Sequence, residues 1–364
     1  MYFGLSEEQK MIEDNFRGSL QRTVSLDSIR AVSTSDQFLD TDLWAELAKL
    51  GMPALMIEEE YGGAGLGLFE AAITSEELGR SAAPVPFVGT AVMAPVALSL
   101  AGSDAQKADW QPKIASGKCR IGIALSEIAG GARRESGVMV TNGILNGTVS
   151  FALDMPGADA VIFRTSDNTL YLVETGAEGL TVELQPTIDG TRSSAKLTLN
   201  NVEAEELPGN TATVSQKIIN AGRIALAAES YGAAEEMLRQ AVAYTKDRKQ
   251  FDRVIGSFQA VKHMCAEMAA ELQPCKALIW YAAYAFDAGQ DDTELSALLA
   301  KSHMDDVGKM IARTATEVHG GMGYTDLVGL HFWFKRIGFN RAQLGGPEKL
   351  RREAAALQGF RAVT

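Results

Sequence analysis

Cysteine is scarce in this chain of 364 residues, which contains only Cys119, Cys265 and Cys275. Three scattered cysteines are too few for a disulfide framework or a zinc site. Long apolar runs are also lacking: no segment reaches the roughly 18 apolar residues of a membrane span. The N-terminus, MYFGLSEEQKMIEDNF, has no basic segment followed by an apolar one. The sequence therefore predicts a cytoplasmic protein without a metal site and without membrane contact.

Positive charge is in deficit. The chain has 34 Lys and Arg residues against 46 Asp and Glu residues, which gives a formal net charge of −12. An acidic protein repels nucleic acid and anionic membrane surfaces, so we exclude both as partners. Any anionic ligand would have to meet a local cluster of cations.

Apolar residues make up 46% of the chain, and their spacing divides it into three zones. From residue 5 to about residue 116 they recur at helical spacing, as at Leu43, Leu47 and Leu50. Between about residues 120 and 202 they alternate, so that AKLTLNNV (195–202) places successive residues on opposite faces of a strand. From about residue 213 onward, long helical stripes return, which suits a helical bundle. This order predicts a mainly α fold with a small β-domain in the middle.

Two dipeptides in the middle zone, Asn142-Gly143 and Asn146-Gly147, are typical of the tight turns that link hairpin strands. Asn and Gly tolerate the left-handed conformation that such turns need. We expect a hairpin turn at each.

Two motifs in the last zone combine charge, aromatic residues and glycine. The first is YTKDRKQFDRVIGSFQA, from Tyr244 to Ala260. Arg248 and Lys249 lie near the end of a predicted helix, where cations commonly interact with the helix dipole. Alternatively, Arg248 grips a pyrophosphate as a fork and Phe251 stacks on an aromatic ring.

The second motif is EVHGGMGYT, from Glu317 to Thr325. Its glycines fit an ordinary left-handed helix cap. They equally fit a place where a phosphate or ribose approaches the backbone closely. Taken alone, neither motif shows whether it is a helix cap or a ligand contact.

Taken together, these motifs resemble the acyl-CoA dehydrogenase family of flavoproteins, in order and in spacing. The opening FGLSEEQ, EEEYGGAGLG, LNGTVSF, IDGTR, RKQF with FQA, and HGGMGYT all match, over essentially the whole chain. The resemblance implies an N-terminal helical domain (1–118), a middle β-barrel or sandwich domain (119–208) and a C-terminal four-helix bundle (209–364).

The family holds FAD between the subunits of a dimer within a tetramer. By motif, Arg248 would meet the FAD pyrophosphate, Phe251 would pack near the adenosine half and Gln259 would hydrogen-bond the cofactor. Glu317 stands where a glutamine is usual, and the backbone at Gly320 and Gly321 would pass along the ADP moiety. The resemblance implies that all of these groups reach into the cofactor site of a neighbouring subunit.

The family's reaction removes two hydrogens from an acyl-CoA thioester to give a 2,3-enoyl-CoA. A glutamate takes the proton α to the carbonyl, flavin N5 accepts a hydride from the β carbon, and an electron-transfer flavoprotein is the usual acceptor. Here Gly345 stands in the glutamate's place. The other position at which the family carries its base is Gly222, directly before Arg223.

Two further departures lie in the β-domain. The family's flavin-lining TEPxxGSD reads SEIAGGARR from Ser126 to Arg134, so that Ser126 is the hydroxyl left to meet a flavin. The tryptophan-x-threonine segment that covers the flavin ring reads Phe151-Ala152-Leu153, and Leu153 cannot make the threonine's side-chain hydrogen bond.

We therefore expect a subunit without a catalytic residue, which completes the FAD site of a sister acyl-CoA dehydrogenase subunit in an α2β2 complex. Such pairs are known in the family for CoA esters of steroid side chains or rings. One alternative is a self-sufficient homotetramer with a relocated base, for which Glu127, Glu229 and Glu348 are candidates, although solvated or capping roles suit them better. Another is a protein of the same fold that binds CoA esters or a partner without redox chemistry.

Overall fold

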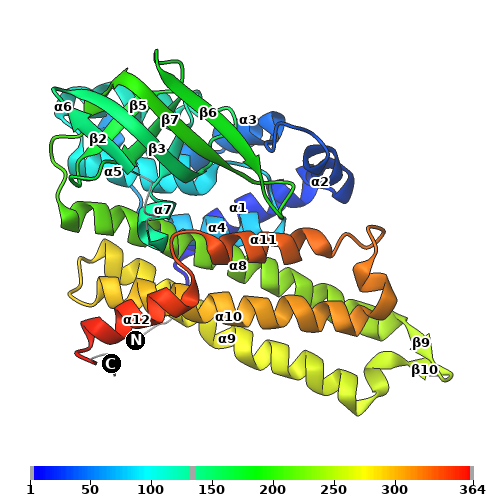
Figure 1. Cartoon of the computed structure of the whole chain (residues 1–364). Coiled ribbons are helices and arrows are strands. Elements are labelled where there is room, and N and C mark those ends of the chain that lie inside the picture. Colours follow the sequence, from blue (N-terminus) through cyan, green and yellow to red (C-terminus); the bar gives the residue numbers. More distant parts are fainter. Residues whose placement is uncertain (1–3, 132–136, 361–364) are drawn as a thin grey trace.

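The computed structural model describes residues 4–131 and 137–360 of the chain. Helices form its first and last parts, and a β-sheet comes between them in the sequence (Figure 1). This arrangement confirms the predicted, mainly helical fold with a middle β-domain. Within the described residues, none of the helices is both long and apolar enough to cross a membrane.

Several N-terminal helices begin at a serine. Ser6, Ser25 and Ser103 each accept a hydrogen bond from the backbone N–H three residues on, and the side chain of that residue bonds back. Such capping boxes satisfy donors that a helix start leaves free. The elements of this part are α1 (Glu7–Thr23), α2 (Leu26–Ser33), α3 (Thr41–Lys49), the 3-10 turns η1 (Met52–Ala54) and η2 (Glu59–Tyr61), α4 (Leu68–Arg80), the π-helix η3 (Val88–Met93), α5 (Ala94–Ala101) and α6 (Asp104–Ala115).

The strands of the β-domain form one sheet in the order β6-β7-β3-β1-β4-β5-β8, with β2 paired to β3 beside this path. The pairing is antiparallel except between β1 and β4. A short helix, α7, follows β1. The elements are β1 (Ile121–Ala124), α7 (Ser126–Gly130), β2 (Gly137–Thr141), β3 (Ile144–Leu153), β4 (Ala160–Arg164), β5 (Leu170–Glu174), β6 (Leu180–Pro186), β7 (Ser193–Glu203) and β8 (Glu205–Glu206).

The two faces of the sheet belong to different cores. On β4, Ile162 joins the large core of the helices, whereas its neighbours Val161 and Phe163 join a separate core within the β-domain. On β7, Leu197 is buried and Thr198 is exposed, as the alternation in the sequence predicts. The β-domain is therefore attached to the helices by one face only.

One of the two predicted hairpin turns is confirmed. Asn142 and Gly143 link β2 to β3 with φ values of 52° and 81°, as a two-residue turn requires. The turn predicted at Asn146-Gly147 is wrong, because both residues lie inside β3 and pair with β2. A Cβ on Gly147 would stand 2.1 Å from the carbonyl oxygen of Gly137, so this glycine permits a close approach of two strands.

The C-terminal helices α8, α9, α10 and α11 pack on one another as a four-helix bundle, and α4 packs on α8 (Figure 1). A small hairpin, β9–β10, joins α8 to α9. The elements are α8 (Ala212–Asp247), β9 (Lys249–Gln250), β10 (Arg253–Val254), the 3-10 turn η4 (Ile255–Ser257), α9 (Gln259–Asp287), α10 (Thr293–His319), the 3-10 turn η5 (Gly320–Tyr324), α11 (His331–Ala342) and α12 (Pro347–Leu357).

Glycines bring α4 and α8 into backbone contact. A Cβ on Gly79 of α4 would stand 1.9 Å from the carbonyl oxygen of Glu229, and one on Gly232 of α8 would stand 1.8 Å from that of Glu76. No side chain fits at either position. This contact fixes the long helix α8 against the N-terminal domain.

A buried ion-pair network ties the β-domain to the bundle. Arg192, from the segment IDGTR, donates to Asp154 at 2.8 Å and to Glu229 of α8 at 2.6 Å. Arg336 of α11 donates to the same Glu229 at 2.7 Å and to Asp189 at 2.6 Å. All five side chains are buried. Buried charges persist only when they are paired in this way, so IDGTR has a structural role.

Candidate functional site

The end of α8 carries an exposed cation and an exposed ring. Arg248 caps the helix, and its backbone N–H donates to the carbonyl of Tyr244 at 2.9 Å. The chain then turns back through the β9–β10 hairpin, at whose tip Phe251 and Asp252 have φ values of 52° and 59°. The ring of Phe251 is 87% exposed. Water is a poor environment for such a ring, so it is available to a ligand or a partner.

The hairpin leads directly into α9. A Cβ on Gly256 would stand 2.9 Å from the carbonyl oxygen of Thr245, so the glycine lets the returning chain lie against α8. Phe258 carries the guanidinium of Arg253 over its ring at 3.9 Å, which is a cation–π geometry. Gln259, the first residue of α9, is exposed.

The end of α10 exposes glycine backbone. Glu317 is exposed in the last turn, and Gly320 ends the helix with a φ of 58°. Gly320 and Gly321 are both exposed, and a Cβ on either would meet open space. A ligand can therefore reach the main chain at these two residues.

These segments lie at one end of the bundle. Tyr244 of α8 stacks on His319 of α10, with ring centroids 4.7 Å apart. Figure 1 shows the β9–β10 hairpin, the start of α9 and the end of α10 at the same end. We call this surface the bundle end. It gathers six residues that the sequence analysis singled out: Arg248, Phe251, Gln259, Glu317, Gly320 and Gly321.

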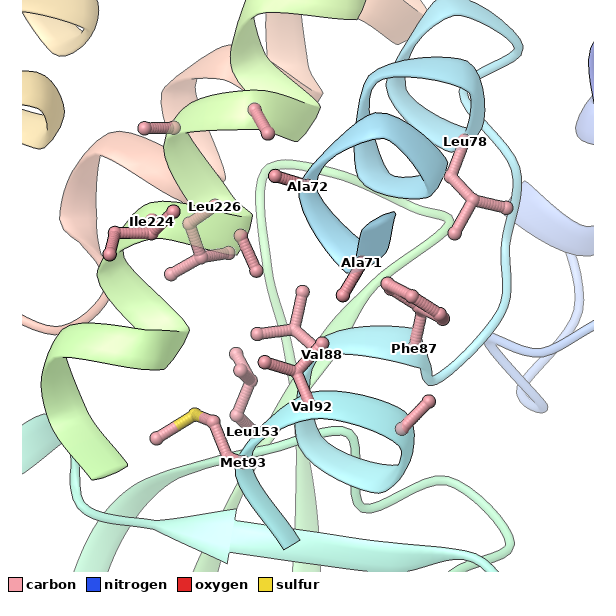
Figure 2. Close-up of a cluster of buried hydrophobic side chains, with 14 of the residues drawn as sticks. Ala71, Ala72, Leu78, Phe87, Val88, Val92, Met93, Leu153, Ile224 and Leu226 are labelled. Atoms are coloured by element: carbon pink, nitrogen blue, oxygen red, sulfur yellow. The ribbon is translucent and has the colours of Figure 1, made fainter. Parts of the chain in front are cut away.

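Gly222 and Gly345, the two positions at which the sequence analysis expected a base, lie elsewhere, in a closed space. A Cβ on Gly222 would stand 2.5 Å from the sulfur of Met93 and 2.6 Å from Cδ1 of Leu344. A Cβ on Gly345 would stand 3.2 Å from the carbonyl oxygen of Ala129. Met93 and Leu344 are fully buried, and Figure 2 shows Met93 reaching from η3 toward α8. We call these five residues the remnant pocket, because side chains occupy the room that a carboxylate would need.

Comparison with known proteins decides the family. Models of the acyl-CoA dehydrogenase N-terminal and C-terminal domains match residues 6–118 and 212–357. Acyl-CoA dehydrogenase IpdE2 of Mycolicibacterium smegmatis is 31% identical over 353 residues, which cover 96% of this chain and 98% of the relative. The chain belongs to the acyl-CoA dehydrogenase family.

Solved structures of the family have the same fold. A variant of the Tcur3481-Tcur3483 steroid ACAD is 29% identical, with a TM-score of 0.89 over 98% of this chain and 99% of that one. The ChsE4-ChsE5 complex from Mycobacterium tuberculosis is 24% identical, with a TM-score of 0.91 over the full length of both chains. Both sites of this chain therefore lie in the fold of an acyl-CoA dehydrogenase.

The bundle end fits the phosphate part of the family's cofactor, FAD. Among the described residues, the guanidinium of the exposed Arg248 has no ion-pair partner, so its parallel N–H groups are free to hold a pyrophosphate. The open space at Gly320 and Gly321 admits phosphate or ribose to the backbone. The carboxylate of Glu317 opposes an anion there, and the exposed cations of the hairpin, Arg248, Lys249 and Arg253, can offset it.

Ser126 is not at the bundle end. It begins α7, a helix that the sequence analysis did not predict, because its five residues stand in a zone of alternating apolar residues. Its hydroxyl is buried without a hydrogen-bond partner among the described residues. The rest of the SEIAGGARR segment beyond Gly131 lies outside the described residues. In the family this segment lines the flavin ring; the described residues Ser126–Gly130 form α7, whose Ala129 carbonyl lies beside Gly345.

Arg223 closes the remnant pocket. It is 1% exposed, and its guanidinium donates to the carbonyl of Leu344 at 3.0 Å, to Asn220 at 3.1 Å and to Glu353 at 3.2 Å. Burial lowers the pKa of Arg223, and the charge of Glu353 opposes that shift. Arg223 is therefore the buried member of an ion pair with the partly exposed Glu353.

Two of the three candidates for a relocated base have environments other than the expected ones. Glu127 and Glu229 are buried, at 5% and 1% exposure, so the expectation that they are solvated or capping residues is wrong. Glu229 is neutralised between two arginines. Glu127 accepts the backbone N–H of Ser150 at 2.8 Å, and its other oxygen has no partner among the described residues. Glu348 is exposed in the first turn of α12 and pairs with Arg341, as expected for a capping residue.

A hollow of about 510 Å³ opens next to Asn220, between the start of α8 and the turn from α9 to α10. Its charged lining residues are Lys217, Asp291 and Glu294. Two carboxylates against one ammonium group do not attract an anionic CoA chain. This hollow is therefore electrostatically unsuited to an anionic CoA ester.

Proposed function

We propose that this chain is the non-catalytic subunit of a heteromeric acyl-CoA dehydrogenase. In this proposal it pairs with a sister subunit in a cytoplasmic α2β2 complex and completes the FAD site of that subunit. The complex oxidises an acyl-CoA thioester to the 2,3-enoyl-CoA, and an electron-transfer flavoprotein takes the electrons.

The observation that carries the proposal is the filled remnant pocket. Glycine has no proton acceptor, so neither Gly222 nor Gly345 can take the α proton. The space beside each is occupied by buried groups, among them Met93, Leu344 and the carbonyl of Ala129. A side chain at residue 222 would therefore have to displace Met93 and Leu344, and one at residue 345 would crowd Leu350 and Ala129.

The bundle end supports the other half of the proposal. FAD supplies the hydride acceptor of the reaction. Arg248 holds the pyrophosphate charge, Phe251 packs beside the adenosine half, and Gln259 donates or accepts a hydrogen bond. Gly320 and Gly321 let the ADP moiety lie on the main chain. All are exposed on this chain, as a contact with a neighbour's cofactor requires.

The substrate we propose is a bulky, steroid-derived CoA ester. The support is the similarity, at 29% identity over nearly the whole chain, to a structure described as a steroid ACAD. In a complex in which one acyl pocket is closed, the open pocket of the other subunit can take a larger acyl group.

Flavin content tests the split site. The chain is purified alone and then after co-expression with its sister subunit, and each sample is characterised by visible spectrum and mass. We expect a colourless chain alone and a yellow complex with about one FAD for every two chains. A yellow chain with one FAD per chain contradicts the split site, and a colourless complex removes the redox function altogether.

The unpartnered oxygen of Glu127 favours one alternative, a self-sufficient enzyme in which Glu127 is the base. It lies in the flavin-lining segment, and a buried carboxylate oxygen without a donor is unusual. A Glu127→Gln variant decides between the two. The alternative requires turnover by the purified chain that this variant abolishes, whereas the split site requires no turnover by either protein.

A further inference from the structure

Tyr244 and His319 join the two segments of the bundle end. Tyr244 lies one turn before Arg248, in the last turn of α8, and His319 is the last residue of α10, directly before Gly320. Their rings stack with centroids 4.7 Å apart and planes inclined by 28°. Stacked rings at this distance attract each other beyond the effect of their burial.

On the α8 side, Tyr244 fixes the start of the hairpin. Its backbone carbonyl accepts the N–H of Arg248 at 2.9 Å. The carbonyl of Arg248 in turn accepts the N–H of Ile255 at 2.8 Å, which closes the base of the hairpin. The main chain of Tyr244, which carries the stacked ring, is therefore bonded directly to that of Arg248.

On the α10 side, His319 is held by its own helix and supports the turn that follows. Its Nδ1 lies 2.7 Å from the carbonyl oxygen of Ala315. A carbonyl only accepts, so Nδ1 carries the hydrogen and donates it. A Cβ on Gly323 would stand 3.0 Å from the Cβ of His319, so the backbone of η5 lies directly against this residue. His319 is 3% exposed and has little freedom to move.

We propose that Tyr244 and His319 are positioning residues, which hold Arg248 in register with the backbone of Gly320 and Gly321. The proposal rests on the proposed function, in which both segments contact one FAD. Helix ends fray unless something holds them, and the stack connects the last turns of two helices. Without it, a cofactor would have to pull the two segments into place and would bind less tightly.

FAD binding by the complex with the sister subunit tests the proposal. Flavin is removed from the purified complex, and FAD is titrated back while the quenching of its fluorescence is recorded. Tyr244→Leu keeps the apolar volume and loses the ring, and we expect it to weaken FAD binding about three- to tenfold. Tyr244→Phe keeps the ring, so the complex with this substitution should bind FAD as tightly as the unchanged complex does.

Tyr171→Leu is the matched control. Tyr171 stacks on Phe163 within the β-domain, with centroids 6.3 Å apart, and lies in neither segment of the bundle end. The Tyr171→Leu substitution should lower the melting temperature of the complex without changing its affinity for FAD. If Tyr171→Leu weakens FAD binding as much as Tyr244→Leu does, the effect is general destabilisation and the positioning role is overturned.

Arg248→Ala separates this inference from the function on which it rests. If Arg248→Ala loses FAD and Tyr244→Leu binds it normally, the positioning role is wrong and the split site stands. If neither substitution affects FAD, the bundle end is not a cofactor contact, and both proposals fail.

Discussion

Replacing Gly345 with glutamate returns a carboxylate to the position where the family carries its base. We expect the variant to be less stable and still inactive. Gly345 has a φ of 100°, and a Cβ there would stand 3.0 Å from Cδ2 of Leu350 and 3.2 Å from the carbonyl oxygen of Ala129. The left-handed backbone costs a residue with a Cβ about 1–2 kcal/mol. Crowding in a packed core adds about 1–3 kcal/mol.

A contact with Arg223 would reduce this loss of stability. Nη2 of Arg223 would lie 3.6 Å from the new Cβ, so the glutamate gains a cationic neighbour. Gly345→Ala is the matched control, because it has the same backbone and Cβ cost without the carboxylate. We expect both variants to lose about 2–5 kcal/mol of unfolding free energy, with the glutamate variant losing the smaller amount if Arg223 pairs with it.

Urea unfolding followed by circular dichroism measures the stability, and dye reduction with FAD and a series of acyl-CoA thioesters measures activity. Turnover by Gly345→Glu without a sister subunit would refute the reasoning, because it would show that the remnant pocket still admits flavin and substrate. Unchanged stability of Gly345→Ala would refute the contacts on which the magnitude rests.

Three other perturbations test the remaining parts of the structure. Arg248→Ala should lower the flavin content of the purified complex, whereas Lys246→Ala, an exposed cation in the last turn of α8, should leave it unchanged; equal losses in absorbance would point to net charge alone. Glu229→Gln removes the shared anion between two buried arginines and should cost about 3–5 kcal/mol in denaturant unfolding, and a loss below about 1 kcal/mol would contradict their pairing. Burial raises the pKa of Glu76 to about 7 from its ordinary 4.5, and the charge of Lys276 opposes the shift. The folded state thus holds this proton more tightly, so between pH 4.5 and about 7 the contribution of Glu76 to stability falls as pH rises, by up to about 3 kcal/mol. Glu76→Gln should flatten the unfolding profile in that window, and identical profiles would exclude this titration.

The spacing of apolar residues was sufficient to predict the order of the helical and β parts, because each kind of element buries its apolar residues at its own period. Leu197 and Leu199 alternate with polar residues and are buried. Asn146-Gly147 shows where the same reasoning fails. A tight turn and a close approach of two strands both need a residue without a bulky side chain, and only the pairing partner distinguishes them.

The candidate site divides in a similar way. The interpretation of RKQF and HGGMG as helix caps is confirmed in part, since Arg248 and Gly320 do end helices, whereas their contact with a cofactor stays a prediction. That they face one surface depends on how α8 packs beside α10, which the sequence does not encode locally. The absence of a base at Gly222 and Gly345 is visible in the letters alone. That Met93 and Leu344 occupy the vacated room, from segments far away in the chain, is not.

The contacts around Gly222 and Gly345 also bear on whether a base could return to these positions in evolution. A glutamate at residue 222 requires the side chains of Met93 and Leu344 to move aside, and one at residue 345 has to adopt a backbone conformation that favours glycine. Under the proposed function, each of these steps taken alone is expected to cost stability and to restore no turnover. A return to catalysis would then need several substitutions at once, which ties the chain to its proposed sister subunit.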